Sequence, residues 1–223
     1  MIFSLLEGLI DFKKKRMRSF FLSLEKMPLT NVAIEDKQEY LTRVGLAYIQ
    51  MRLPIEKITV EFENKLKEVI NRGILRAKIR EASEGDLVNV MNIYNKAWMT
   101  SNEPFAPMRI ESLKKIFNIP EITMLIANVY GNDAGFIILD FEGDNKEYGV
   151  IAGLGIMPRF QRKGLGKILG MAAWNFFKQK GVKELRCEVY VDNKASYNFI
   201  KSLGFEESGT KIYKKEDFHL SAD

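Results

Sequence analysis

Residues 153–166 read Gly153-Leu154-Gly155-Ile156-Met157-Pro158-Arg159-Phe160-Gln161-Arg162-Lys163-Gly164-Leu165-Gly166 and join a strand-like run to a basic loop that opens a helix. The first four amides of a helix have no partner within the helix, and glycine lets a ligand approach the backbone closely. The segment 161–166 therefore predicts a cradle for phosphate oxygens. Four basic side chains surround this cradle with positive charge: Arg159, Arg162, Lys163 and Lys167.

The same loop is also compatible with a basic, glycine-rich turn that binds no ligand. It differs from a nucleotide P-loop because the Gly-Lys-Ser/Thr ending is missing, and it lacks the Gly-x-Gly-x-x-Gly pattern of a dinucleotide-binding turn. The loop alone leaves the two interpretations open.

Strands and helices alternate on both sides of this loop. Alternating apolar residues predict strands over residues 77–81, 123–129, 135–141, 148–157, 184–191 and 211–214. Helical spacing predicts helices over residues 109–118, 164–180 and 195–203, and a further helix up to Trp98 that starts at a capping box of Ser83 and Asp86. Residues 130–133 predict the turn of a β-hairpin.

The first third of the chain predicts helices instead, over residues 2–12, 36–51 and 54–72. The middle helix carries a stripe of Tyr40, Val44, Tyr48 and Met51, and Gly73 is a plausible C-cap for the last one. We therefore expect a helical N-terminal extension over residues 1–75 and a second domain over residues 76–223. The apolar stripes of the extension would be buried against that domain or across a dimer interface.

Composition excludes several classes of protein. With 46% hydrophobic and 28% charged residues the chain is expected to be globular, and no run reaches the roughly 18 apolar residues that a membrane-spanning helix needs. One cysteine, Cys187, and one histidine, His219, disfavour a disulfide, a Ser-His-Asp triad, a Cys-His dyad and a Cys/His zinc site. No metal is therefore expected.

The charge balance favours an anionic partner. The formal net charge of +5 does not choose among phosphates, nucleic acid and a membrane surface. An apolar start precedes the basic run 13–18, the reverse of a secretory signal, so a cytoplasmic protein is expected.

The loop 161–166 resembles the pyrophosphate signature Gln/Arg-x-x-Gly-x-Gly/Ala of the GNAT superfamily of acyl-coenzyme A dependent N-acetyltransferases. A second resemblance follows: Val191-Asp192-Asn193-Lys194-Ala195 and then Leu203-Gly204-Phe205 look like that family's strand, asparagine, helix and Gly-Phe ending. The resemblance implies an α/β (α+β) fold with a mixed, mostly antiparallel sheet flanked by helices. It also implies acetyl-coenzyme A as co-substrate.

Further expectations about the site follow from this resemblance. The strands over 149–157 and 184–191 would splay apart, so that the pantetheine arm pairs with the open edge near Gly153 and Gly155. The amide of Leu154 would stabilise the oxyanion that develops on the thioester carbonyl. Asn193 would contact the pantetheine arm, cap the following helix, or do both. The implied cofactor-binding residues are Leu154, Ile156, Gln161, Arg162, Lys163, Gly164, Leu165, Gly166 and Asn193.

Two catalytic positions depart from the family pattern. Val150 stands where many members have a glutamate base, and Ile200 stands where many have a tyrosine acid. The candidate substitutes are Glu147 as base and Tyr197, one helical turn before Ile200, as acid; an exposed charge and a packing role are the alternatives. Glu188 and Asp192 either line an acceptor pocket or form a solvated face. Cys187 alternates with core residues, which predicts packing.

The leading functional prediction is an N-acetyltransferase that passes acetyl directly to a primary amine in a ternary complex. The acceptor is a small molecule or a peptide, bordered by Phe105 and Met108, and a homodimer is possible. The alternative is a catalytically degenerate regulatory module that binds coenzyme A. A nucleic-acid or membrane-surface adaptor using the run 13–18 is a third class, but acids nearly balance bases in the rest of the first third.

Overall fold

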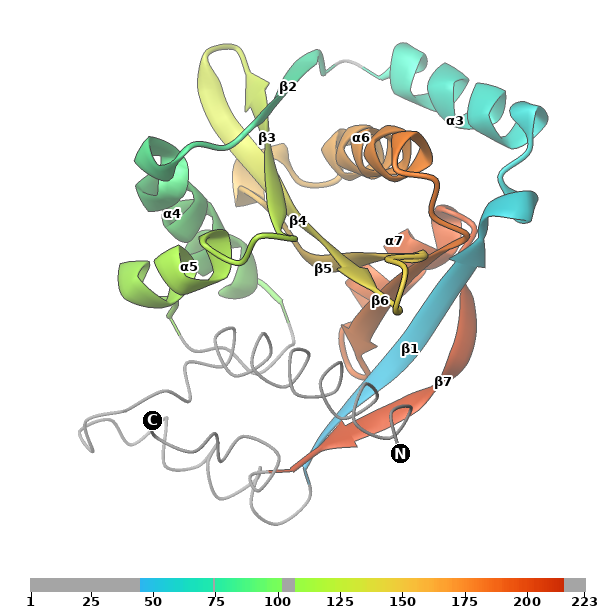
Figure 1. Cartoon of the computed structure of the whole chain (residues 1–223). Coiled ribbons are helices and arrows are strands. Elements are labelled where there is room, and N and C mark those ends of the chain that lie inside the picture. The colour runs from blue at the N-terminus through green and yellow to red at the C-terminus, as the bar shows by residue number, and fades with distance from the viewer. Residues whose placement is uncertain (1–44, 74, 102–106, 215–223) are drawn as a thin grey trace.

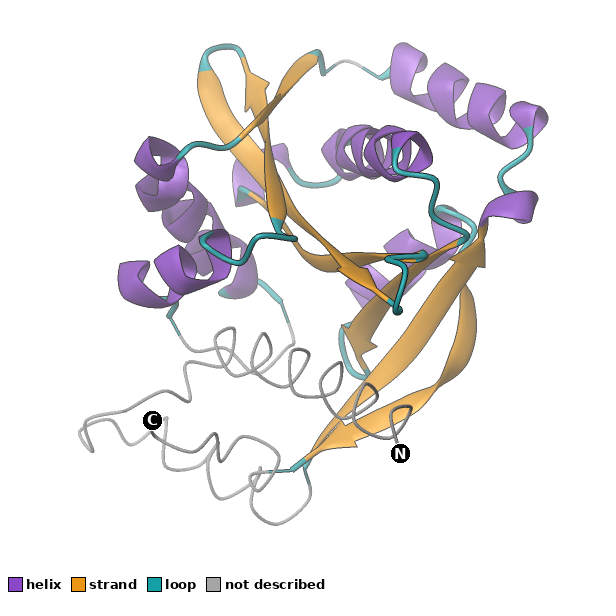
Figure 2. Ribbon diagram, in the orientation of Figure 1, coloured by secondary structure: helices purple, strands orange, loops and turns teal. Residues whose placement is uncertain are grey.

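A seven-stranded mixed sheet forms the centre of the described part of the chain (Figures 1 and 2). The computed structural model describes residues 45–73, 75–101 and 107–214. The strand order is β2-β3-β4-β5-β6-β1-β7, and every neighbouring pair is antiparallel except β5 and β6. The strands are β1 (Leu46–Pro54), β2 (Ala77–Glu81), β3 (Thr123–Val129), β4 (Asn132–Glu142), β5 (Tyr148–Ile156), β6 (Glu184–Tyr190) and β7 (Glu206–Tyr213).

Helices cover both faces of this sheet. They are α3 (Val60–Arg72), α4 (Leu87–Trp98), α5 (Ile110–Phe117), α6 (Leu165–Gln179) and α7 (Lys194–Ser202), with the short 3-10 helices η1 (Ile55–Lys57), η2 (Glu84–Asp86) and η3 (Pro158–Phe160). Alternate residues of β4 separate two cores: Phe136 and Ile138 pack with α4 and α5, whereas Ile137 and Leu139 pack with α6. This layering confirms the predicted α/β class with a mostly antiparallel sheet.

Local turn chemistry explains two of the confirmed elements. Tyr130 and Gly131 both have positive φ, 50° and 80°, as a two-residue hairpin turn of type I′ requires. The turn is shorter than the predicted 130–133, because Asn132 and Asp133 already pair with Val129 and Asn128. The capping box of Ser83 and Asp86 is present at η2, directly before α4.

The helix predicted over residues 36–51 is wrong where the structure describes it. Residues 46–51 belong to β1, which pairs with β6 on one edge and with β7 on the other. Tyr48 and Met51 suit a helical stripe, but pairing on two edges outweighs a weak local preference. The predicted helix over 2–12 and the start of 36–51 lie outside the described residues.

The sheet therefore takes strands from both sides of residue 75, and the division of the chain into two domains there stays a prediction. The predicted helix over 54–72 begins later than expected. η1 follows β1, and Thr59 then caps α3 by accepting a hydrogen bond from the Phe62 amide at 3.2 Å. Gly73 is the C-cap, as predicted.

The parting of β5 and β6 positions the site. Their pairing covers Tyr148–Ile151 against Glu184–Cys187, and β5 then continues to Ile156 without β6. A register shift between Ile138 and Leu139 marks a bulge in the β4–β5 ladder at the same level. The predicted splay of these strands is therefore present, and it opens a gap in the sheet.

Among the helices of the described residues, none is both long and apolar enough to cross a membrane. The cytoplasmic location stays a prediction.

Candidate active site

The first cleft lies where β5 and β6 have parted, at the N-terminal ends of α6 and α7. Its volume is about 500 Å³, and its lining includes Leu154 and Ile156 of β5, Gln161 and Gly164 of the basic loop, and Asn193 before α7. With Arg162 and Gly166, which also line it, seven of the nine predicted cofactor-binding residues meet in one cleft.

The loop at the start of α6 has the backbone of an anion cradle. Arg162 and Gly164 both have positive φ, 57° and 90°. A Cβ on Gly164 would meet nothing within 4 Å, so this glycine is required by its conformation and not by lack of space. Alternation of right- and left-handed residues turns successive amides towards one point, and the first amides of α6 add to them.

The other predicted cradle residues have different positions. Gly166 lines the cleft, but its Cβ would lie 2.9 Å from the Phe199 ring, so this glycine also lets α7 pack against α6. Leu165 is buried in the core and can offer only its backbone. Lys163 is exposed, and the lining includes Arg162 and Lys167 instead. Arg159 turns away and donates to Asn132 Oδ1 at 3.2 Å.

The amide of Leu154 lies on the open edge of β5. The Met157 amide donates to the Ala134 carbonyl of the β4 side at 2.9 Å, and the Ile156 carbonyl accepts from Gln161 Nε2 at 3.0 Å on the opposite side. Because backbone groups of a strand alternate between its two edges, Leu154 and Ile156 share the edge that faces the cleft. The amide of Leu154, which the sequence predicts as the oxyanion donor, therefore faces the first cleft.

Gly155 and Asn193 each have a structural role beside their place in the lining of this cleft. A Cβ on Gly155 would lie 2.5 Å from the Phe136 ring, so this glycine makes room for the core under α4, and it also lines the cleft. Asn193 fits both alternatives: its side chain accepts from the Ser196 amide at 3.1 Å as the N-cap of α7, and it lines the cleft.

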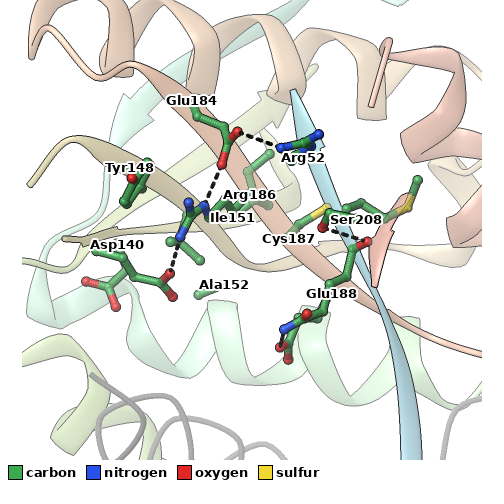
Figure 3. Close-up of a pocket in the computed structure, with 14 residues that line it drawn as sticks. Arg52, Asp140, Tyr148, Ile151, Ala152, Glu184, Arg186, Cys187, Glu188 and Ser208 are labelled. Atoms are coloured by element: carbon green, nitrogen blue, oxygen red, sulfur yellow. Dashed lines mark hydrogen bonds and ion pairs between the residues drawn. The ribbon is translucent and has the colours of Figure 1, made fainter. Parts of the chain in front are cut away.

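A second cleft has a volume of about 390 Å³ and lies next to the point where β5 and β6 part (Figure 3). It opens on the same sheet face as α4 and α5, over the part that these helices leave uncovered. Its floor consists of side chains in cross-strand rows. The registers give the rows Glu142–Tyr148–Glu184, Asp140–Val150–Arg186–Arg52 and Glu188–Gln50, all of which line the cleft.

Arg186 is fixed at one end of the second cleft. Its guanidinium lies 3.4 Å from the ring centroid of Tyr148, donates to Glu184 Oε1 at 2.7 Å and lies 3.6 Å from Glu142 Oε2. Arg52 of β1 approaches Glu184 at 4.0 Å from the far side. Figure 3 shows this charged group at one end and Glu188 at the other.

Glu188 is the first residue of β6 beyond its pairing with β5. Tyr213 donates its hydroxyl to the carboxylate, with distances of 3.0 and 2.9 Å to the two oxygens, and Gln50 Nε2 lies 3.5 Å from Oε1. The sequence left two alternatives for Glu188 and Asp192, an acceptor pocket or a solvated face. Glu188 lines the second cleft. Asp192 is exposed and outside the described linings of both clefts.

The two sequence candidates for base and acid do not reach either described cleft lining. Glu147 accepts from the Asn145 amide at 2.9 Å, and hydrogen bonds from its own amide and from Asn145 lower the pKa of its carboxyl. Tyr197 donates its hydroxyl to Glu207, and this hydrogen bond raises the pKa of the phenol. The partners of both groups, Asn145 and Glu207, lie outside the described linings of the two clefts.

Three further residues were singled out in the sequence: Cys187, Met108 and Phe105. Cys187 is buried in the core, as predicted, and burial raises the pKa of its thiol. Met108 is also buried, whereas Phe105 lies outside the described residues. Within the ranges that the structure describes, no group of three His, Cys, Asp or Glu side chains is placed to hold a metal ion.

Sequence analysis missed the part of the second cleft that β1 and β4 supply. Asp140 and Glu142 interrupt an otherwise apolar strand, and both residues are only 7% exposed, so acids within an apolar run were the available signal. Gln50 and Arg52 gave no such signal, because their strand was mistaken for a helix.

Comparison with known proteins places the chain in a family. The family model described as Acetyltransferase (GNAT) family matches residues 87–205, more than half of the chain. The chain therefore belongs to the GNAT family and is an acetyltransferase.

Two relatives illustrate the similarity. An uncharacterized N-acetyltransferase of Methanocaldococcus jannaschii is 26% identical over 152 residues, which cover 65% of this chain and 67% of the relative. A mycothiol acetyltransferase of Rhodococcus erythropolis is 34% identical over 65 residues, which cover 29% of this chain and 22% of the relative. The chain thus matches only about a fifth of the length of that enzyme.

Solved structures share the fold. The aminoglycoside N-acetyltransferase AAC(6')-Iy in complex with CoA has a TM-score of 0.52 and 18% identity, over 63% of this chain and 95% of that one. An aminoglycoside acetyltransferase from an uncultured soil metagenomic sample, in complex with sisomicin, has a TM-score of 0.53 and 22% identity, over 62% and 95%. At these identities the likeness concerns the fold alone.

Proposed function

We propose that this acetyltransferase transfers acetyl from acetyl-coenzyme A to a primary amine by direct attack within a ternary complex. The observation that carries the proposal is a pair of clefts at the point where β5 and β6 part, one lined by β5 up to Ala152 and the other from Leu154 onwards. One cleft offers loop amides and a free strand edge to the coenzyme, and the other offers carboxylates to an amine. The runner-up is a coenzyme A binding module without catalysis, favoured by Val150 and Ile200 at the usual catalytic positions.

The coenzyme would bind in the first cleft. Its pyrophosphate would lie on the amides of 161–166, flanked by Arg162 and Lys167. The pantetheine arm would pair with the free edge at Leu154 and Ile156. The thioester carbonyl would then accept a hydrogen bond from the Leu154 amide, which stabilises the oxyanion as the amine attacks.

The second cleft supports a positively charged acceptor. Its described lining carries four carboxylates, on Asp140, Glu142, Glu184 and Glu188, against the two guanidinium groups of Arg52 and Arg186. Such a site attracts an ammonium, which must lose a proton before it can attack. Deprotonating an amine with a pKa of about 10.4 costs roughly 4.6 kcal/mol at pH 7, so a base beside the amine is valuable.

In this proposal Glu188, which lines the second cleft beside the point where β5 and β6 part, takes that proton. In the proposed reaction Glu188 takes one proton from the bound ammonium, directly or through a water. The neutral amine nitrogen then bonds to the acetyl carbon and gives its second proton to water. The carbon–sulfur bond then breaks. The coenzyme A thiolate should resemble a free cysteine, with a pKa of about 8.5, so it leaves readily and is protonated by water.

Tyr197→Phe tests whether an acid is needed on α7. Because the Tyr197 hydroxyl donates to Glu207, we expect this variant to lower kcat by less than about tenfold. The measurement is steady-state turnover with a saturating amine. A loss of a hundredfold or more, with acetyl-coenzyme A affinity intact, would show that Tyr197 protonates the leaving thiolate.

An amine panel tests the proposed function as a whole. Purified protein should release the coenzyme A thiol from acetyl-coenzyme A only when an accepted amine is present. Binding without turnover on small amines, polyamines and peptides would favour the regulatory module.

Gly164→Val should weaken acetyl-coenzyme A binding in calorimetry at least about tenfold, because a β-branched residue strains a φ of 90° in the cradle. Unchanged affinity in Gly164→Val would contradict the cradle.

A further inference from the structure

The helix α3 precedes the segment that matches the family model, yet it lies against α6, the helix whose N-terminal end lines the first cleft. Its Glu63 carboxylate accepts from Trp174 Nε1 at 2.9 Å and from Lys178 Nζ at 2.7 Å, both on α6. These hydrogen bonds lower the pKa of Glu63, so the contact is ionic at neutral pH. The helix is thus docked at a defined position.

Close approaches give the direction of α3. A Cβ on Gly166 would lie 2.9 Å from Phe199, and one on Gly170 would lie 3.0 Å from Leu203, so α6 and α7 run side by side in the same direction. The start of α3 lies at their far end, because Phe62 is 3.2 Å from a Cβ on Gly204. At 1.5 Å per residue, the seven residues from Phe62 bring Val69 about 10 Å back towards the start of α6.

Val69 accordingly lines the coenzyme cleft, together with Gly166, Lys167 and Phe199. It is 46% exposed, although the stripe beside it, Leu66 and Ile70, packs against the core. An apolar side chain that is half exposed at the edge of a cleft can bury its surface against a flat, weakly polar ligand group.

We propose that α3 forms a third wall of the coenzyme site and that Val69 contacts the adenosine end of the coenzyme; this inference rests on the proposed function. The acetyl end lies along Leu154 and the pyrophosphate on the loop 161–166. The ligand would then continue past Lys167 towards Val69, which lines the same cleft. Helix α3 therefore takes part in recognising the nucleotide half of the coenzyme.

A matched pair of variants on one helix tests the contact. Val69→Asp should weaken acetyl-coenzyme A binding about tenfold in calorimetry, because it replaces the apolar wall by a charge that repels the phosphates. Val60→Asp is the control: Val60 is 69% exposed at the first residue of the same helix and does not line the cleft. Both variants should keep the melting temperature of the wild type.

Acetyl-pantetheine, which lacks the adenosine bisphosphate, locates the effect along the ligand. Turnover with this short thioester should be the same in Val69→Asp and in the wild type. Equal acetyl-coenzyme A affinity in the two variants would overturn the contact, and an equal loss with both thioesters would overturn its assignment to the adenosine end. A wild type that binds no acetyl-coenzyme A would instead contradict the proposed function.

Discussion

Deleting residues 1–54 is expected to leave a chain that does not fold. The deletion removes β1, which lies between β6 and β7 and pairs with both. Four of its apolar side chains are buried: Leu46, Tyr48, Met51 and Leu53. Burying such side chains contributes about 1.5 to 3 kcal/mol each, so their loss costs roughly 6 to 12 kcal/mol. That is comparable with the roughly 5 to 15 kcal/mol that stabilises a typical domain.

Three further variants separate β1 from the residues before and after it. Deleting residues 1–44 retains β1 and tests only what precedes it. Met51→Ala removes a side chain that is 1% exposed and should lower the free energy of unfolding by about 2 to 5 kcal/mol, whereas Val60→Ala should change it by less than about 0.5 kcal/mol. Thermal and urea unfolding provide the measurement. A fragment 55–223 as stable and monodisperse as the full chain would refute the structural role of β1.

The lining of the first cleft was predictable because its signals are local. A loop with positive φ at Arg162 and Gly164, followed by a helix, is encoded within a few residues, and the same holds for Asn193 as the cap of α7. The face of the sheet to which a strand residue points also follows from the local sequence, because side chains alternate along a strand. The alternation along β6 was therefore enough to suggest Glu188 for the acceptor pocket. Sequence spacing could not tell whether that face was a pocket or solvated surface.

The missed features depend on contacts between distant parts of the chain. β1 is a strand because β6 and β7, more than 130 residues later, supply partners for its two edges. The spacing of Tyr197 and Ile200 predicted a shared helix face, but Glu207 of β7 takes the hydroxyl of Tyr197. Gly155 lines the first cleft, but the sequence did not show that the Phe136 ring packs against it as well. Each of these outcomes depends on which residue from a distant part of the chain contacts the position, and the local sequence does not show that contact.

Glu188→Gln is expected to lower kcat/KM for the acceptor about 100- to 1,000-fold at pH 7. Glutamine can still accept the hydrogen bond from Tyr213, so the wall of the cleft is retained while the proton acceptor is lost. General base catalysis typically contributes 10²- to 10⁴-fold, and the pH profile is the decisive measurement.

The pH profile separates a base from a structural carboxylate. Below the pKa of the acceptor, the fraction of free amine rises about tenfold for each unit of pH, and an amine that is already deprotonated needs no base. The deficit of Glu188→Gln should therefore shrink as the pH approaches about 10 for a lysine-like amine, and near pH 8 for an α-amine. A merely structural role would leave the deficit constant.

Glu147→Gln and Asp192→Asn are the controls, because their carboxylates lie outside the described lining of both clefts. Both variants should change kcat/KM less than about threefold. If Glu147→Gln shows the large, pH-dependent loss and Glu188→Gln does not, the base is Glu147, and the proton must travel from the amine to the β4–β5 loop.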